Sequence, residues 1–248
     1  MIESIDNIDD ELDDVNLVNQ FEISDAERCI TNNLLAVFNG NNYIGTAFII
    51  DNKGTFISAG HNFRNLSIPH KLYWGDKELP YETVHIEYTE QFSYTDVYRS
   101  CQDLYIGRII SNDETPHLGL TVIHGMKTNN DLIIIGLKSA KIPIFNKKIF
   151  IEPISINKQQ FYLYYIKSHI TNPQNLASRP IHTGDLRLNY NNIRCLDFNG
   201  VKPCEYSGIS GGPVCTDGKI IGMVIADMFI TIDYILQFLP QTTKRDEK

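Results

Sequence analysis

Three short segments carry a histidine, an aspartate and a serine in settings that suit nucleophilic catalysis. His61 ends the segment FISAGH, where Ala59 and Gly60 are small enough for the imidazole to leave the end of a strand without crowding. Asp131 opens the apolar segment DLIIIGL, which places its carboxylate next to the core. Ser210 stands in GISGGPV, with glycines on both sides. A serine hydroxyl needs an adjacent base to become a nucleophile, and histidine is suited to take its proton at neutral pH.

The glycines around Ser210 predict a tight turn whose backbone amides converge. Glycine adopts the backbone conformations that such a turn needs. Backbone N–H groups that meet beside a nucleophile form an oxyanion hole, which stabilises the charge that develops on the attacked carbonyl oxygen. One segment therefore offers both a nucleophile and its electrostatic support.

Four segments resemble those of chymotrypsin/trypsin-like serine peptidases of the bacterial intracellular type, over about residues 34–239: FISAGH, NNDLIIIGLKSA, GISGGPV with GKIIGMV, and ITIDYILQFL. The resemblance implies a serine endopeptidase with a His-Asp-Ser triad and an acyl-enzyme intermediate. It makes His61 the general base and then the general acid, Asp131 the carboxylate that holds the imidazole, and Ser210 the nucleophile. The amides of Gly208 and Ser210 bind the oxyanion, and neither a cofactor nor a metal ion is expected.

A second aspartate competes for the role given to Asp131. Asp103, in CQDLYI, also opens an apolar strand, and its spacing from the histidine (103 − 61 = 42) is the more usual one for the family. The spacing of Asp131 (131 − 61 = 70) implies an insertion at about residues 70–120. We favour Asp131 because its strand is more continuous and its segment matches the family over more positions.

Three positions depart from the pattern of the family. Secreted members carry an aspartate before the serine, which pairs with a new N-terminal ammonium after cleavage; here Ile209 stands there, so this kind of activation is not expected. Asn62 follows His61, so the disulfide that flanks the family's histidine is absent. Ile225 replaces a hydroxyl residue that often backs the catalytic aspartate.

The resemblance places the substrate pocket beside Cys204 and Glu205 on one side and Ala226 and Asp227 on the other. Two acidic groups near this pocket would select Lys or Arg next to the cleaved bond. The alternative is that both point to solvent, because acidic side chains are seldom buried without a partner.

Many short apolar runs separated by Gly, Asn and Asp predict an all-β protein. The resemblance makes it a double six-stranded β-barrel with a short C-terminal helix. We expect an acidic N-terminal tail at residues 1–22 and a peptidase domain at 23–248. Within it, the N-terminal barrel spans about 34–140, the C-terminal barrel about 141–228 and the helix about 230–239. A capping box, Ser24 with Glu27, predicts a helix over about residues 26–35.

The composition limits the partners of the protein. The 248 residues carry 30 acidic and 22 basic side chains, a formal net charge of -8, which speaks against a nucleic-acid binder. No apolar run is long enough to cross a membrane, and residues 1–19 have no secretory pattern, so we expect a cytoplasmic protein. Five widely spaced cysteines favour free thiols over a zinc site.

Protein or peptide substrates are expected, and the tyrosine-rich region of about residues 70–120 leaves room for a regulatory protein partner. A second interpretation keeps the fold but not the chemistry. It makes the protein a catalytically silent pseudo-peptidase that acts as a binding module in a bacterial stress or defence assembly. Ile209 and Ile225 favour it, whereas the intact serine turn and all three triad residue types oppose it.

Overall fold

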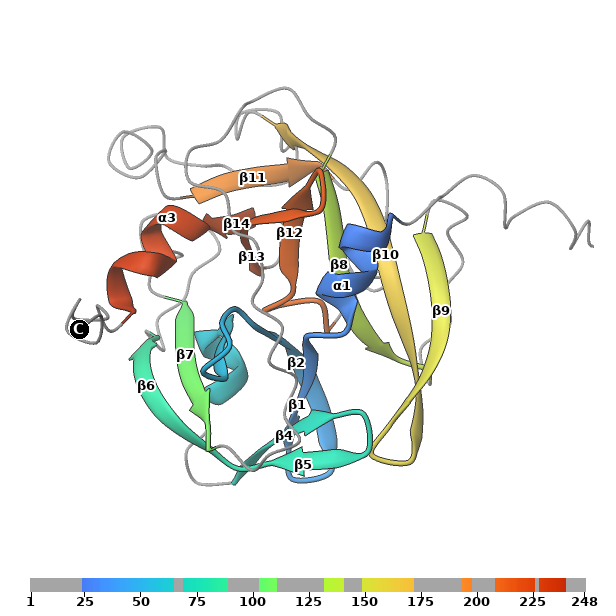
Figure 1. Cartoon of the computed structure of the whole chain (residues 1–248), viewed down its shortest axis with the longest axis vertical. Coiled ribbons are helices and arrows are strands. Elements are labelled where there is room, and N and C mark those ends of the chain that lie inside the picture. Colours follow the sequence, from blue (N-terminus) through green and yellow to red (C-terminus); the bar gives the residue numbers. More distant parts are fainter. Residues whose placement is uncertain are drawn as a thin grey trace, which may run out of the picture.

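Two antiparallel β-sheets make up most of the structure, a computed structural model (Figure 1). It describes residues 24–64, 69–88, 103–110, 132–140, 149–171, 193–197, 208–225 and 228–239. The first sheet occupies the lower left of Figure 1, and the second occupies the upper part and the right side. The all-β prediction is confirmed.

The first sheet forms an open half-barrel. Its strand order among the described residues is β5 (Lys77–Leu79), β4 (His70–Trp74), β1 (Leu34–Asn39), β2 (Asn42–Ile49), β3 (Thr55–Ala59), β7 (Leu104–Ile109) and β6 (Tyr81–Glu87). The turn between β2 and β3 is fixed by Asp51, whose Oδ1 accepts hydrogen bonds from the backbone of Lys53 (2.9 Å) and Thr55 (2.8 Å). Such local bonds are the reason why aspartate favours turns.

The second sheet closes into a barrel. Its strands are β8 (Leu132–Ser139), β9 (Ile149–Ile156), β10 (Gln159–Thr171), β11 (Ile193–Asp197), β12 (Pro213–Thr216), β13 (Lys219–Ile225) and β14 (Met228–Thr231). Because β11 pairs with both β14 and β10, the strands β8, β10, β11, β14, β13 and β12 form a ring of six, and β9 pairs with β10 outside it. This ring agrees with the expected six-stranded barrel.

Short helices flank the sheets near both ends of the part of the chain that the structure describes. Helix α1 (Asp25–Thr31) has both bonds of the predicted capping box, but it ends before residue 35 because β1 starts at Leu34. Near the C-terminus, β14 is followed by α3 (Ile232–Ile235) and the 3-10 turn η6 (Leu236–Phe238), which lie beside the first sheet in Figure 1. Tyr234 donates a hydrogen bond to Glu87 of β6 (3.1 Å). None of the helices in the described ranges has the length and apolar character needed to span a membrane.

The sheets divide the chain earlier than expected. Strands β4 to β7, which lie largely in the expected insertion, complete the first sheet, so this region is part of the barrel framework. Strand β8 already belongs to the second sheet, and the change from one sheet to the other therefore falls before residue 132. The predicted tail at residues 1–22 lies outside the described residues.

One continuous apolar core joins the sheets and supports the segments between them. Phe38 of β1 and Tyr43 of β2 meet Phe161 of β10 edge to face, with ring centroids 6.0 and 5.0 Å away. The same core contains Ile135 and Leu137 of β8. Aromatic contacts of this kind add to the stability gained by burial alone, so the two sheets are held in one relative position.

Candidate active site

The pairing of β3 with β7 brings Asp103 to His61. Ala59, the last residue of β3, pairs with Leu104, the first residue of β7, in an antiparallel register. The next residues outward are Gly60 and Asp103, and His61 follows in a 3-10 turn, η2 (Gly60–Phe63). Gly60 is needed at this point, since a Cβ there would lie only 2.6 Å from the carbonyl oxygen of Glu87.

The carboxylate of Asp103 binds His61 twice. Its Oδ1 accepts the backbone N–H of His61 at 2.7 Å, and its Oδ2 lies 2.7 Å from Nδ1 of the ring. Asp103 is only 1% exposed, whereas the His61 side chain is 32% exposed. Since a carboxylate accepts, the contact favours the tautomer with the proton on Nδ1, which leaves Nε2 as the acceptor of the neutral ring. The imidazole is thus oriented as a base, with its edge open to solvent.

This geometry favours Asp103 over the aspartate that the sequence analysis preferred. Asp131 itself lies outside the described residues. The strand that follows it, β8, is in the second sheet, and its middle part packs on the serine turn. A Cβ on Gly136 would lie 2.6 Å from Cγ1 of Ile209, and a Cβ on Gly212 would run into the carbonyl of Ile135. Leu132 is three residues before Ile135, about 10 Å along a strand. The contact of Asp103 with Nδ1 fills the position for which Asp131 was the candidate.

The predicted turn around Ser210 is present. Gly211 donates to the carbonyl of Val224 (2.8 Å), and Gly212 donates to the carbonyl of Ile209 (2.7 Å). Gly208 and Gly211 have positive φ values of 94° and 88°, a region that favours glycine. The turn leads directly into β12.

The turn fits tightly against the first sheet. A Cβ on Gly211 would collide with the carbonyl oxygen of Thr46 and would lie 2.6 Å from Oγ of Ser58 and 2.9 Å from the backbone nitrogen of Ala59. The segment ISGG therefore packs against β2 and β3, the strands that lead to the histidine.

Main-chain and side-chain bonds tie Ser210 to the segment that carries His61. The carbonyl oxygen of Ser210 accepts the N–H of Thr46 (3.0 Å) and Nδ2 of Asn62 (3.0 Å). Asn62 also donates to Oγ of Ser58 (3.1 Å), and Ser58 donates to the carbonyl of Thr46 (2.7 Å). The residue next to the base thus holds the backbone of the candidate nucleophile.

Other groups of the serine turn have no partner within the described chain. The hydroxyl of Ser210, which is partly exposed, forms no hydrogen bond with any described residue, His61 included. The same holds for the N–H groups of Gly208 and Ser210, the predicted oxyanion donors, whereas those of Gly211 and Gly212 are bonded as above.

The remaining predicted positions divide into two groups. Ile209 and Ile225 are each 1% exposed. Ile225 lies in the core described above and Ile209 in a second apolar cluster, so neither position offers a polar group. The four expected pocket residues lie outside the described residues: Cys204, Glu205, Ala226 and Asp227. Among described residues there is no cluster of His, Cys, Asp or Glu suited to a metal ion.

Sequence reasoning missed the side chains that connect the two sheets at the site. Tyr43, Thr46 and Asn62 all contact the serine turn, yet each is remote from it in sequence. The position of Asn62 directly after the histidine was the available signal, but it was interpreted only as a lost disulfide.

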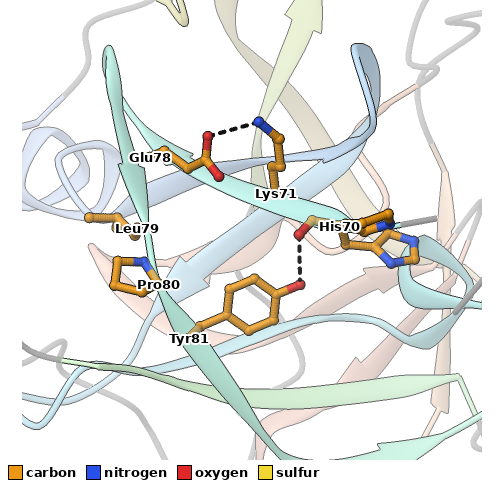
Figure 2. A pocket seen from close by; sticks show the side chains of 7 residues that line it. His70, Lys71, Glu78, Leu79, Pro80 and Tyr81 are labelled. Carbon is orange, nitrogen blue, oxygen red and sulfur yellow. Dashed lines mark hydrogen bonds and ion pairs between the residues drawn. The ribbon is translucent and has the colours of Figure 1, made fainter.

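A separate hollow of about 440 Å³ lies at the edge of the first sheet (Figure 2). Lys71 and Glu78 form an ion pair of 3.0 Å at its rim, and Tyr81 donates to the carbonyl of His70 (3.3 Å). None of the candidate catalytic residues lines it, so it is distinct from the site built on His61.

Comparison with known proteins places this arrangement in a known architecture. The structure is similar to the active form of the Rv3671c protease from M. tuberculosis (TM-score 0.51, 15% identity, covering 87% of this chain and 82% of that one). It is also similar to neuropsin, a serine protease expressed in the limbic system of mouse brain (TM-score 0.54, 15% identity, covering 83% of this chain and 93% of that one). A third similar structure is kallikrein-related peptidase 10 (TM-score 0.53, 16% identity, covering 83% of this chain and 91% of that one). The chain has the chymotrypsin fold.

The comparisons show the fold of this protein, and any activity must be argued from its own residues. No protein-family model matches the sequence. A search of curated proteins also finds no match. At sequence identities near 15%, shared architecture does not transfer an activity.

Proposed function

We propose that this protein is a serine endopeptidase whose triad is His61, Asp103 and Ser210. The observation that carries the proposal is the double contact of the buried Asp103 carboxylate with His61, at 2.7 Å to the backbone N–H and 2.7 Å to Nδ1. A carboxylate in this position stabilises the imidazolium that forms when the histidine takes a proton. The bond from Asn62 to the Ser210 carbonyl supports the placement of the serine near this base.

In the proposed reaction, Oγ of Ser210 attacks the carbonyl carbon of the scissile peptide and its proton moves to Nε2 of His61. The N–H groups of Gly208 and Ser210 stabilise the oxyanion of the tetrahedral intermediate. The C–N bond then breaks, and Nε2 returns the proton to the leaving amine. Water attacks the acyl ester with His61 as base, which releases the acid and restores the serine.

Labelling and cleavage together test this function. A fluorophosphonate probe is expected to label the wild-type protein at Ser210 and to leave Ser210→Ala unlabelled. A mixed peptide library is expected to be cleaved by the wild type, with Ser210→Ala slower by about 10⁴–10⁶. Cleavage by Ser210→Ala at the wild-type rate, with contamination excluded, would refute the proposal.

The second candidate is the pseudo-peptidase, a binding module without catalysis. The absence of a hydrogen bond between the Ser210 hydroxyl and any described residue favours it. Catalytic hydrogen bonds are often long in enzymes without substrate and tighten when it binds, so we give the peptidase priority. A wild-type protein that no serine-reactive probe labels would support the binding module.

The proposal also includes the expected substrates, protein partner and location of the protein. Substrates are proteins or peptides, and the chemistry above needs no cofactor. A regulatory protein partner and a cytoplasmic location remain part of the proposal, supported by the charge and composition of the chain.

A further inference from the structure

Two hydroxyl groups of β2 reach the carbonyl of Gly208, at the start of the serine turn. The hydroxyl of Tyr43 lies 2.8 Å and Oγ1 of Thr46 lies 3.0 Å from this oxygen. Tyr43 also lies 2.6 Å from the carbonyl of Leu137, and the N–H of Leu137 donates to Oγ1 of Thr46 (3.1 Å). One compact network thus joins β2, β8 and the turn.

The two hydroxyl protons of this network are enough to give each of its two carbonyl oxygens a hydrogen bond. Each hydroxyl has one proton and can also accept. Tyr43 donates to Leu137 along the shortest contact, Thr46 donates to Gly208, and Thr46 accepts the N–H of Leu137. Both carbonyls are satisfied, so the network has one consistent hydrogen-bonding arrangement.

The surroundings of Tyr43 make its position firm. Its ring meets Phe38 and Phe161 edge to face, with centroid distances of 5.8 and 5.0 Å. Burial raises the pKa of its hydroxyl above the ordinary value of 10, so the group stays protonated and able to donate at the pH of normal activity. A Cβ on Gly208 would lie 2.6 Å from Cε1 of this ring.

The turn is held at the carbonyls on both sides of residue 209. Thr46 donates to the Gly208 carbonyl, and the Tyr43 hydroxyl, which donates to Leu137, lies 2.8 Å from the same oxygen. The Ser210 carbonyl accepts from the N–H of Thr46 and from Nδ2 of Asn62. A peptide unit is planar, so these bonds fix the N–H directions of Ile209 and Gly211, on either side of the unit that carries the Ser210 N–H. The carbonyl of that middle unit belongs to Ile209 and accepts the N–H of Gly212 (2.7 Å). Between the carbonyls of Gly208 and Ser210, the apolar side chain of Ile209 is buried and offers no charge for an ion pair.

We propose that Tyr43 and Thr46 are positioning residues that hold the oxyanion turn in its working conformation in the uncleaved chain, in place of a charged partner at residue 209. This inference rests on the proposed peptidase function and adds how the oxyanion hole of that peptidase is kept in its active conformation. The turn is preformed by bonds between the two sheets, and activity needs no cut at the N-terminus.

The test compares Tyr43→Phe with Tyr73→Phe. Both tyrosines pack edge to face on Phe38, at 5.8 and 5.2 Å, but the Tyr73 hydroxyl donates to Glu78 (2.8 Å), away from the turn. In Tyr43→Phe we expect kcat on a short ester to fall about 10- to 100-fold while KM stays within about threefold, because a loosened oxyanion hole stabilises the transition state less. Tyr73→Phe is expected to retain the wild-type kcat.

Hydrogen exchange gives a readout that does not depend on catalysis. Exchange of the backbone amides at residues 208–212 is expected to speed up about tenfold or more in Tyr43→Phe and to stay at the wild-type rate in Tyr73→Phe. Unchanged exchange in Tyr43→Phe overturns the positioning role, as does faster exchange in an active protein whose kcat does not fall. If the wild type is never labelled by fluorophosphonate, the peptidase function fails, and faster local exchange still supports the bonds that hold the turn.

Discussion

The side-chain amide of Asn62 donates a hydrogen bond of 3.0 Å to the main-chain oxygen of Ser210. Asn62 directly follows the candidate base His61, and the same Nδ2 also binds Oγ of Ser58 on β3. The amide is therefore a non-covalent link from the histidine segment to the serine turn. Asn62 is 2% exposed, so these bonds are made in a setting where losing a partner is costly.

Asn62→Ala is expected to lower both stability and kcat. Removal of a buried hydrogen-bonded amide costs about 1–3 kcal/mol of unfolding free energy, and the freed Ser210 carbonyl loosens the nucleophile. Denaturant unfolding and kcat on a short ester provide the two measurements.

Asn33→Ala is the matched control for this variant. Asn33 is fully buried and its Nδ2 also donates to a main-chain oxygen, that of Cys29 (2.8 Å), but at the end of α1. It should lose similar stability and keep the wild-type kcat. Equal kcat in the two variants would show that Asn62 has only a structural role.

Asp103→Asn is expected to reduce kcat about 10⁴-fold, whereas Asp131→Asn stays within about threefold of the wild type. An amide at residue 103 presents a donor where Nδ1 of His61 needs an acceptor, which favours the wrong tautomer. Parallel assays of the two variants decide between the aspartates. An inactive Asp131→Asn with an active Asp103→Asn would reverse our assignment and leave the chymotrypsin fold untouched.

The two cysteines whose burial is described differ in expected reactivity. Cys29 is exposed on α1, whereas Cys215 is fully buried on β12, and desolvation raises the pKa of its thiol well above the ordinary value of 9. The thiolate is the reactive form, so Cys215 should stay unmodified in the folded protein at pH 7 and at pH 9, whereas Cys29 is accessible to the reagent. Peptide mass spectrometry after iodoacetamide treatment measures this, and native labelling of Cys215 would contradict it.

The sequence contained most of the local information in this fold. Apolar runs between turn residues predicted strands such as β3, β7 and β13, and the pair of Ser24 and Glu27 predicted the start of α1, because these signals depend on neighbours in the chain. The glycine turn around Ser210 was equally local.

The contacts between site residues could not be predicted from the sequence, because they depend on the register between distant strands. The preference for Asp131 rested on the apolar strand that follows it, but that strand belongs to the second sheet. The pairing of Ala59 with Leu104 delivers Asp103 to His61, and no single segment encodes this pairing. Tyr43 likewise meets Gly208 across 165 residues of sequence.

Gly211→Ala is expected to be far more damaging than Gly75→Ala, although both glycines have positive φ values, 88° and 55°. The backbone cost of an alanine in this region is about 1–2 kcal/mol at either position. At Gly75, in the turn between β4 and β5, a Cβ would meet nothing within 4 Å, so this cost is all that we expect. At Gly211 the new Cβ would run into the carbonyl of Thr46 and approach Oγ of Ser58 to 2.6 Å.

The backbone of β2 and β3 cannot yield without disturbing the sheet, so the serine turn must move away from the first sheet in Gly211→Ala. That movement breaks the bond from Thr46 to the Ser210 carbonyl and separates the nucleophile from His61. We expect fluorophosphonate labelling at least about 100-fold slower, with a larger loss of unfolding free energy than in Gly75→Ala. Labelling at equal rates in the two variants would show that the close packing of the turn on β2 and β3 does not position Ser210.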